Sequence, residues 1–348
     1  MSPDAEPGAR PDRPDDPDEP VRRTPDEVPT DTSDRLQRIE QQARLAGNEV
    51  RAQVRAGRRR IKAKSDEINA RSGRNLVFAI LIGVVLGGAL LLSLLFIKQL
   101  FILFGVAMVG FVCLELSNAM RSTGRHVPRV PTLAVAIVIV PASYYFGPAG
   151  QWISLVAGIL FLTAWCIVRA SLRSEPPPRA DVWNDVLASA FVQLYVTFLG
   201  SFTVMLAAQE RGEFWVLGFL LVVISIDTSA YVFGLNFGKH KMVPRISPSK
   251  TWEGLAGAAL TSLVVSVAVS VFLFDMPWWF GLVVGPVLLV TATAGDLTES
   301  MVKRDLQIKD ISSWLPGHGG FFDRLDSILP SGAMAFALYF WGASLTLH

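Results

Sequence analysis

Long apolar segments alternate with short polar segments from residue 76 to the end of this 348-residue chain. Many of the apolar segments reach 17 residues, the length that an α-helix needs to cross about 30 Å of hydrocarbon. The pattern predicts an all-α, polytopic membrane protein with about nine transmembrane helices. The predicted spans are residues 76–97, 100–119, 130–146, 150–169, 186–207, 214–235, 255–274, 278–296 and 328–347.

The first 74 residues differ in composition from the rest of the chain. Residues 1–34 contain eight prolines and eleven acidic residues, which predicts a disordered acidic tail. Residues 35–74 carry twelve Lys or Arg against four acidic residues, which predicts a basic, partly helical cytoplasmic lead-in, either solvated or held against anionic lipid. Residues 75–348 then form a transmembrane domain, and any catalytic site is expected there.

The positive charges lie almost entirely on one side of the predicted spans. With the N-terminus inside, 30 of the 32 Lys and Arg residues fall in the tail or the inner loops, and only Lys98 and Arg211 fall outside. Short loops rich in Lys and Arg remain in the cytoplasm. We therefore expect a multi-pass protein of the cell membrane, with its C-terminus outside and its active site on the cytoplasmic side.

Three side chains stand alone within apolar segments. Cys113 and Cys166 have no spacing that suits a metal cluster or a disulfide framework, so we expect two small buried side chains. Glu115 lies in an apolar helix, where we expect it to snorkel to the cytoplasmic face. Lining a lipid or nucleotide site is the alternative role for Glu115.

The first long inner loop follows Asp227, an acid within an apolar helix. An ionised Asp in that setting must face a polar partner or a cavity. Ser247 followed by Pro248 predicts a helix start, with Ser as the N-cap and Pro at the first helical position. The free N–H groups of that helix start, with Ser249 and Lys250, would form an anion-binding site.

The second long inner loop carries two groups of acids. If the eighth helix extends inward, four polar residues share one of its faces, namely Asp296, Glu299, Ser300 and Lys303. Asp323 and Asp326 are three residues apart just before the last span. Two acidic helix ends can converge on one divalent cation, and carboxylate oxygens suit Mg²⁺. We predict a metal site made by Asp296, Glu299, Asp323 and Asp326.

Glycines and basic residues accompany these acids. Gly319 and Gly320, which follow His318, would let the backbone approach a phosphate closely. The nearby positive charges are Lys303, Arg304, Lys309 and Arg324. Carboxylates that hold a metal beside such cations are what phosphoryl or nucleotidyl transfer requires, because the cations neutralise charge on the attacking and leaving oxygens.

Several motifs in this region resemble one known family. They are Ser-Met-Val-Lys-Arg from Ser300, Lys309-Asp310, Leu-Pro-Gly-His-Gly-Gly from Leu315, Asp-Arg-Leu-Asp from Asp323, the Asp227 segment, and Arg-Ile-Ser-Pro-Ser-Lys-Thr-Trp-Glu-Gly from Arg245. Together they resemble the signature of the phosphatidate cytidylyltransferases, or CDP-diacylglycerol synthases. The resemblance covers roughly residues 76–348, and Gln307 stands where a small residue such as Gly is expected.

The resemblance implies transfer of CMP from CTP to phosphatidate, giving CDP-diacylglycerol and pyrophosphate, in phospholipid biosynthesis. It implies Mg²⁺ held by Asp296 and Asp323, and suggests a second metal such as K⁺. It places the chain in the lipid bilayer, without a nucleic-acid partner, and is compatible with a homodimer. On this basis we expect catalytic roles for Asp296, Asp323, Lys303, Arg304, Arg324 and Lys309, and substrate binding by Asp227, Ser247, Ser249, Lys250, Ser300, His318, Gly319 and Gly320.

Other functions compete with this interpretation. An ion-coupled transporter would use Asp227 and Asp296 as its pathway, although these acids lie at cytoplasmic helix ends rather than at the midplane. A polyprenol kinase or a cytidylyltransferase for an ether lipid would keep the metal and phosphate site and change the substrate. A purely structural scaffold would not need so many charged groups between Asp296 and Asp326.

Overall fold

The computed structural model describes residues 76–312, 314 and 319–346. The predictions for the tail 1–34, the lead-in 35–74 and the site residue His318 lie outside the described residues. Seven of the described helices are long and apolar enough to cross a membrane. The prediction of an all-α, polytopic membrane protein is therefore confirmed, with one small two-stranded hairpin added to the helices.

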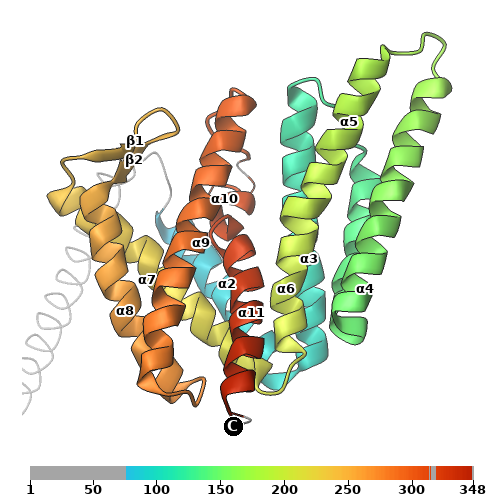
Figure 1. Cartoon of the computed structure of the whole chain (residues 1–348). Coiled ribbons are helices and arrows are strands. Elements are labelled where there is room, and N and C mark those ends of the chain that lie inside the picture. The colour runs from blue at the N-terminus through green and yellow to red at the C-terminus, as the bar shows by residue number, and fades with distance from the viewer. Residues whose placement is uncertain (1–75, 313, 315–318, 347–348) are drawn as a thin grey trace, which may run out of the picture. The chain divides into compact units, whose positions relative to one another are not determined.

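The helices follow one another along the chain, with the longest connections before α8 and before α10 (Figure 1). They are α2 (Leu76–Phe96), α3 (Lys98–Ser122), α4 (Arg129–Ser171), α5 (Arg179–Val192), the π-helix η1 (Gln193–Phe198), α6 (Leu199–Ala207), α7 (Gly212–Phe237), α8 (Trp252–Phe272), α9 (Trp278–Asp305), α10 (Phe322–Leu325) and α11 (Ile328–Thr346). The strands β1 (Lys241–Val243) and β2 (Ser247–Thr251) pair in antiparallel fashion between α7 and α8. Apolar segments of this length become helices because a helix satisfies its own backbone groups in hydrocarbon.

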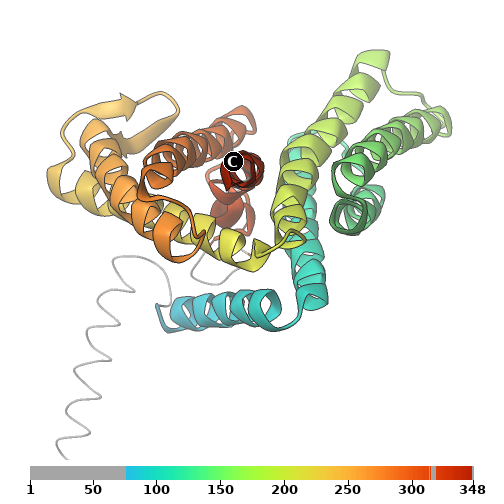
Figure 2. The same ribbon diagram turned by 60° about the horizontal axis from the view of Figure 1, so that its bottom comes forward.

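Helix α4 consists of two predicted spans joined at Gly147. A straight helix of its 43 residues would be about 65 Å long, roughly twice the thickness of the hydrocarbon core. Gly147 has φ 60° and ψ −147°, which lies outside the helical region. Val135 and Ile139 of the first half pack against Leu155 and Leu162 of the second. The two halves therefore lie side by side and antiparallel (Figure 2).

Small residues allow α7 and α8 to pack closely. A Cβ on Gly218 would lie 2.3 Å from the ring of Phe274, and a Cβ on Gly257 would lie 2.2 Å from the ring of Phe233. The ring of Trp215 stacks on Phe274 at a centroid distance of 4.0 Å. Close packing of this kind drives helix association in lipid. The packing of α7 against α8 therefore holds in place the helix ends that carry candidate site residues.

The predicted helix start at Ser247 and Pro248 is wrong. These two residues open strand β2, and helix α8 begins only at Trp252. Thr251 is the N-cap, and its side-chain oxygen accepts a hydrogen bond of 3.1 Å from the N–H of Gly254. The irregular pairing of β1 with β2 leaves room for a proline, which cannot donate to a strand ladder.

Charged segments gather at one end of the described helices. The hairpin lies at the upper end in Figure 1, and the C-terminus lies at the opposite end. At the upper end, Arg125 of the α3–α4 connection pairs with Asp305 at the end of α9, at 2.7 Å. At the lower end, Lys98 pairs with Glu213 at 2.9 Å.

Candidate active site

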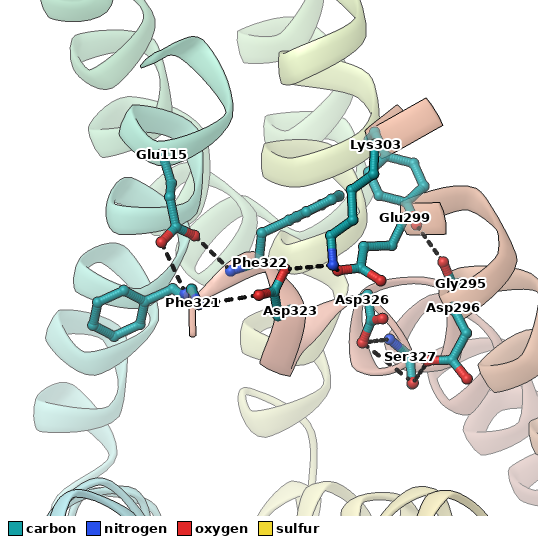
Figure 3. A network of polar contacts seen from close by, with 12 residues as sticks. Glu115, Gly295, Asp296, Glu299, Lys303, Phe321, Phe322, Asp323, Asp326 and Ser327 are labelled. Atoms are coloured by element: carbon teal, nitrogen blue, oxygen red, sulfur yellow. Dashed lines mark hydrogen bonds and ion pairs between the residues drawn. The ribbon is translucent and has the colours of Figure 1, made fainter. Parts of the chain in front are cut away.

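Helix α9 brings its predicted polar face to the junction with α10. Lys303 lies one turn after Glu299, and its Nζ is 2.5 Å from Glu299 Oε1. The same Nζ is 3.1 Å from Asp323 Oδ1 on α10 (Figure 3). One ammonium group therefore bridges a carboxylate of α9 and a carboxylate of α10, and their convergence on a divalent cation stays a prediction.

A second pair of acids meets one turn earlier on α9. Ser327, just before α11, donates from its hydroxyl to Asp296 Oδ1 at 2.8 Å. The N–H of Ser327 donates to Asp326 Oδ1 at 2.7 Å, so one serine contacts both carboxylates (Figure 3). Gly295 permits this contact, because a Cβ there would lie 2.1 Å from the carbonyl oxygen of Asp326. We call Asp296, Glu299, Asp323 and Asp326 the carboxylate cluster.

The carboxylate cluster is largely withdrawn from solvent. Glu299 and Asp326 are 8% and 7% exposed, and Ser327 is 2% exposed. Like charges held together at low exposure repel one another strongly unless a cation offsets them. Lys303 offsets one pair, and Lys250 of strand β2 forms an ion pair with Asp296 of the other. A cluster of this kind favours binding of additional cations.

The β-hairpin and α7 border the same region. Asp227 lies beside Ser327, with Asp296 and Lys250 near it, so the polar partner that the sequence required is present. The hydroxyls of Ser247 and Ser249 lie 3.5 Å apart at the start of β2. Of the predicted phosphate-binding residues of the hairpin, Lys250 reaches the carboxylate cluster, and it does so from a strand rather than from a helix N-terminus.

The glycines before α10 shape the approach to Asp323. Gly319 has φ +81°, a left-handed conformation that favours glycine, and a Cβ there would lie 2.8 Å from Asp323 Oδ2. The N–H of Gly320 donates to the same Oδ2 at 3.1 Å. These glycines lie close to a carboxylate of the chain itself, and their approach to a phosphate stays a prediction.

The remaining predicted residues lie around this core. Ser300 follows Glu299 on α9 and is partly exposed, whereas Lys309 and Arg324 are exposed. Arg304 is exposed and donates from Nε to the carbonyl oxygen of Ile246 at 3.4 Å, which ties the end of α9 to the β1–β2 turn. Among the predicted basic residues, Lys250 and Lys303 form ion pairs with the carboxylate cluster.

The predicted position of the Glu115 side chain is wrong. The side chain does not snorkel to the surface, because Glu115 is 0% exposed. It accepts hydrogen bonds from the N–H groups of Phe321 and Phe322 at 3.0 and 2.7 Å (Figure 3). It accepts another from the hydroxyl of Ser312. Its position inside an apolar helix was the only sequence signal, and the segment that it contacts lies about 200 residues away.

Divalent cations in proteins are held by several oxygen ligands. Within residues 76–312, 314 and 319–346, no three His, Cys, Asp or Glu side chains are arranged to hold a metal ion. Glu299 Oε1 and Asp323 Oδ1 are nevertheless buried without a well-formed hydrogen bond, although Lys303 approaches both. Mg²⁺ usually takes one or two carboxylates together with substrate phosphates and waters. The carboxylate cluster fits that mode of binding.

The fold and site define a multi-pass membrane protein with a lysine-paired carboxylate cluster, an arrangement suited to phosphate groups and divalent cations. The model of the cytidylyltransferase family matches residues 77–341. The chain therefore belongs to the cytidylyltransferase family.

Curated relatives carry a more specific name. The phosphatidate cytidylyltransferase of Mycobacterium bovis is 34% identical over 272 residues, which cover 76% of this chain and 89% of that protein. The enzyme of that name from Mycobacterium leprae is 32% identical over 290 residues, covering 81% and 93%. The one from Staphylococcus haemolyticus is 36% identical over 199 residues, covering 57% and 73%.

Proposed function

We propose that this chain is a phosphatidate cytidylyltransferase whose active site is the carboxylate cluster with Lys250 and Lys303. It transfers CMP from CTP to phosphatidate, giving CDP-diacylglycerol and pyrophosphate in phospholipid biosynthesis. The observation that carries the proposal is that two carboxylate pairs lie beside two lysines where the end of α9 meets α10 and the start of α11, within a membrane protein of this family.

The reaction requires little covalent chemistry from the protein. A phosphate oxygen of phosphatidate attacks the α-phosphorus of CTP, a new P–O bond forms, and the bond to the β-phosphate oxygen breaks. Pyrophosphate leaves with the electron pair. Because the attacking oxygen is already anionic, no strong general base is needed, and positioning with charge neutralisation dominates.

The residues of the chain supply those two effects. Lys303 and Lys250 are held beside the carboxylate cluster and are placed to contact the phosphates that enter it. Arg304, Arg324 and Lys309 add positive charge around the opening, and Ser300, Ser247 and Ser249 offer hydroxyl donors. Asp227 orients Lys250 and Ser327 from α7. The backbone at Gly319 and Gly320 keeps Asp323 in place.

We further propose that the carboxylate cluster holds Mg²⁺ together with substrate phosphates. Asp296 and Asp323 would be its ligands, with Glu299 and Asp326 in support. When bound, Mg²⁺ neutralises charge on the phosphate oxygens and orients the two substrates. A second cation such as K⁺ remains a prediction of the resemblance.

The membrane topology is part of the proposal. The seven spans found by length and apolar composition become nine when α2 and the two halves of α4 are counted separately. The distribution of Lys and Arg then favours the cell membrane with the N-terminus and the active site on the cytoplasmic side. The acyl chains of phosphatidate would reach the site sideways from the bilayer.

Pyrophosphate release by purified protein in detergent tests the reaction. Wild type is compared with Asp323→Asn and with Asp275→Asn, a matched change to an exposed acid in the α8–α9 connection. We expect release that requires CTP, phosphatidate and Mg²⁺, and a loss of about 100-fold or more in Asp323→Asn only. Folded wild-type protein that releases no pyrophosphate would overturn the proposal and favour transport. Release with another lipid acceptor in place of phosphatidate would change the substrate.

A further inference from the structure

Glu115 is a buried carboxylate that belongs to α3 and not to the carboxylate cluster. Its two oxygens accept three hydrogen bonds, all from the segment between α9 and α11. Two of the donors are the consecutive backbone N–H groups of Phe321 and Phe322, at the start of α10. A carboxylate is costly to bury, and it is tolerated here because these donors satisfy it.

A second residue of α3 contacts the same segment. Phe111 lies one turn before Glu115, and its ring stacks on Phe321 with centroids 4.7 Å apart and planes 11° apart. Phe111 also meets the edge of Trp314, at 6.4 Å between centroids. Gly320 fits between these contacts, because a Cβ there would lie 2.7 Å from Glu115 Oε1. We call Phe111 and Glu115 the α3 dock.

The α3 dock is connected to the reacting region through Asp323. Asp323 follows directly after the two residues whose N–H groups Glu115 binds. Its carboxylate accepts from the N–H of Gly320 and pairs with Lys303. A shift of α10 on the dock would therefore displace Asp323 from Lys303 and Glu299.

We propose that Glu115 is a positioning residue for CMP transfer, which holds α10 so that Asp323 faces Lys303 and Glu299. The role is exerted through backbone hydrogen bonds, and Glu115 itself contacts neither substrate. An apolar side chain could fill the same space, but it could not fix the orientation of two consecutive N–H groups. The inference rests on the proposed function, because its readout is the rate of CMP transfer.

The test uses full-length Glu115→Gln in detergent. The amide oxygen of Gln can still accept one backbone N–H, but its NH₂ group meets the other N–H and removes that hydrogen bond. Ser117→Ala is the matched control, because Ser117 is buried on the same helix and its hydroxyl has no partner in the described structure. We expect kcat to fall about 10- to 100-fold in Glu115→Gln, with wild-type values in Ser117→Ala.

A double-mutant comparison separates positioning from a general loss of folded protein. Rates are measured with radiolabelled CTP in the Asp323→Asn background, with and without Glu115→Gln. If Glu115 acts through Asp323, the second change lowers the residual rate by less than about twofold. An equal fold loss in both backgrounds would overturn the proposal and show a general structural role.

Proteolysis gives a readout that does not depend on activity. We expect trypsin to cleave after the exposed Lys309 faster in Glu115→Gln than in wild type, with unchanged cleavage in Ser117→Ala and an unchanged elution volume for all three proteins. Equal cleavage in Glu115→Gln and wild type would overturn the proposed hold on α10. Wild type that releases no pyrophosphate would instead refute the proposed function, so the two failures are distinct.

Discussion

Ser327 joins α9 to the start of α11 by donating its hydroxyl to Asp296 at 2.8 Å. Its backbone N–H binds the neighbouring carboxylate of Asp326, so one residue sets the spacing of two acids. A further hydroxyl contact joins the same two helices one turn away, between Thr291 and Ser331 at 3.1 Å. The first contact touches the carboxylate cluster, and the second does not.

These two contacts allow stability and activity to be separated. Ser327→Ala removes a hydrogen bond to Asp296, and we expect CMP transfer to fall about tenfold, equivalent to about 1.4 kcal/mol. Ser331→Ala removes a comparable link and should lower stability by about 1 kcal/mol with a near-normal rate. Rates per folded molecule and thermal midpoints in detergent measure both effects. Equal loss of activity in the two variants would contradict a special role for Ser327.

Lys250 gives the β-hairpin a direct part in the site. Its ammonium pairs with Asp296, whereas Lys241 on the partner strand is exposed. Lys250→Ala should lower CMP transfer about 100-fold, because a cation placed at the phosphates is lost, and Lys241→Ala should change it less than about twofold. Steady-state rates over a range of CTP concentrations test this difference. Similar effects of both changes would mean that only the overall charge of the hairpin matters.

Gln307 ends helix α9 in a conformation that usually belongs to glycine. It has φ 53°, its N–H donates to Arg304, and the N–H of Ile308 donates to Lys303, which together form a Schellman motif. Gln307→Gly should raise stability by up to about 1 kcal/mol, because glycine adopts this conformation without steric cost. Gln307→Ala is the control and should give no gain. The measurement is the midpoint of thermal unfolding in detergent. A lower midpoint for Gln307→Gly than for the wild type would contradict the expectation.

The sequence predicted most of the spans because period and length alone determine where hydrocarbon-crossing helices form. It predicted the shared face of Asp296, Glu299 and Lys303 because helical spacing is regular. The left-handed Gln307 also agrees with the expectation of a small residue at that position. Local regularities of this kind need no knowledge of the tertiary structure.

The sequence interpretation failed where distant segments decide the structure. Ser247 and Pro248 carry a strong local signal for a helix start, yet pairing with β1 makes them a strand. Glu115 was expected at the surface, but its partners come from a segment about 200 residues away. The pairing of Lys250 with Asp296 likewise joins strand β2 to helix α9, whose relative placement no periodicity reveals.

Gly295 allows α9 to approach the start of α11. A Cβ at this position would lie 2.1 Å from a backbone oxygen of Asp326, which cannot move aside as a side chain can. Gly295→Ala should therefore destabilise the protein by about 1–3 kcal/mol and disturb the carboxylate cluster. Gly87→Ala in α2 is the control, because nothing lies within 4 Å of the added Cβ, and it should leave activity unchanged. Normal activity and stability in Gly295→Ala would contradict the observed packing.

The proposed topology makes the two ends of the helices accessible from opposite sides of the membrane. Lys309 is exposed after α9 on the proposed cytoplasmic side, and Asp275 is exposed in the α8–α9 connection at the other end. A membrane-impermeant maleimide applied to intact cells should label Asp275→Cys but not Lys309→Cys. Permeabilised cells should label both variants.

The two native cysteines should not interfere with this labelling experiment. Cys113 and Cys166 are 0% and 7% exposed, so background labelling of the parent chain should be low. Labelling of Lys309→Cys in intact cells would place the carboxylate cluster outside, where cytoplasmic CTP cannot reach it. Labelling of Asp275→Cys alone supports the inward orientation, because the positive charges then remain in the cytoplasm as the distribution of Lys and Arg requires.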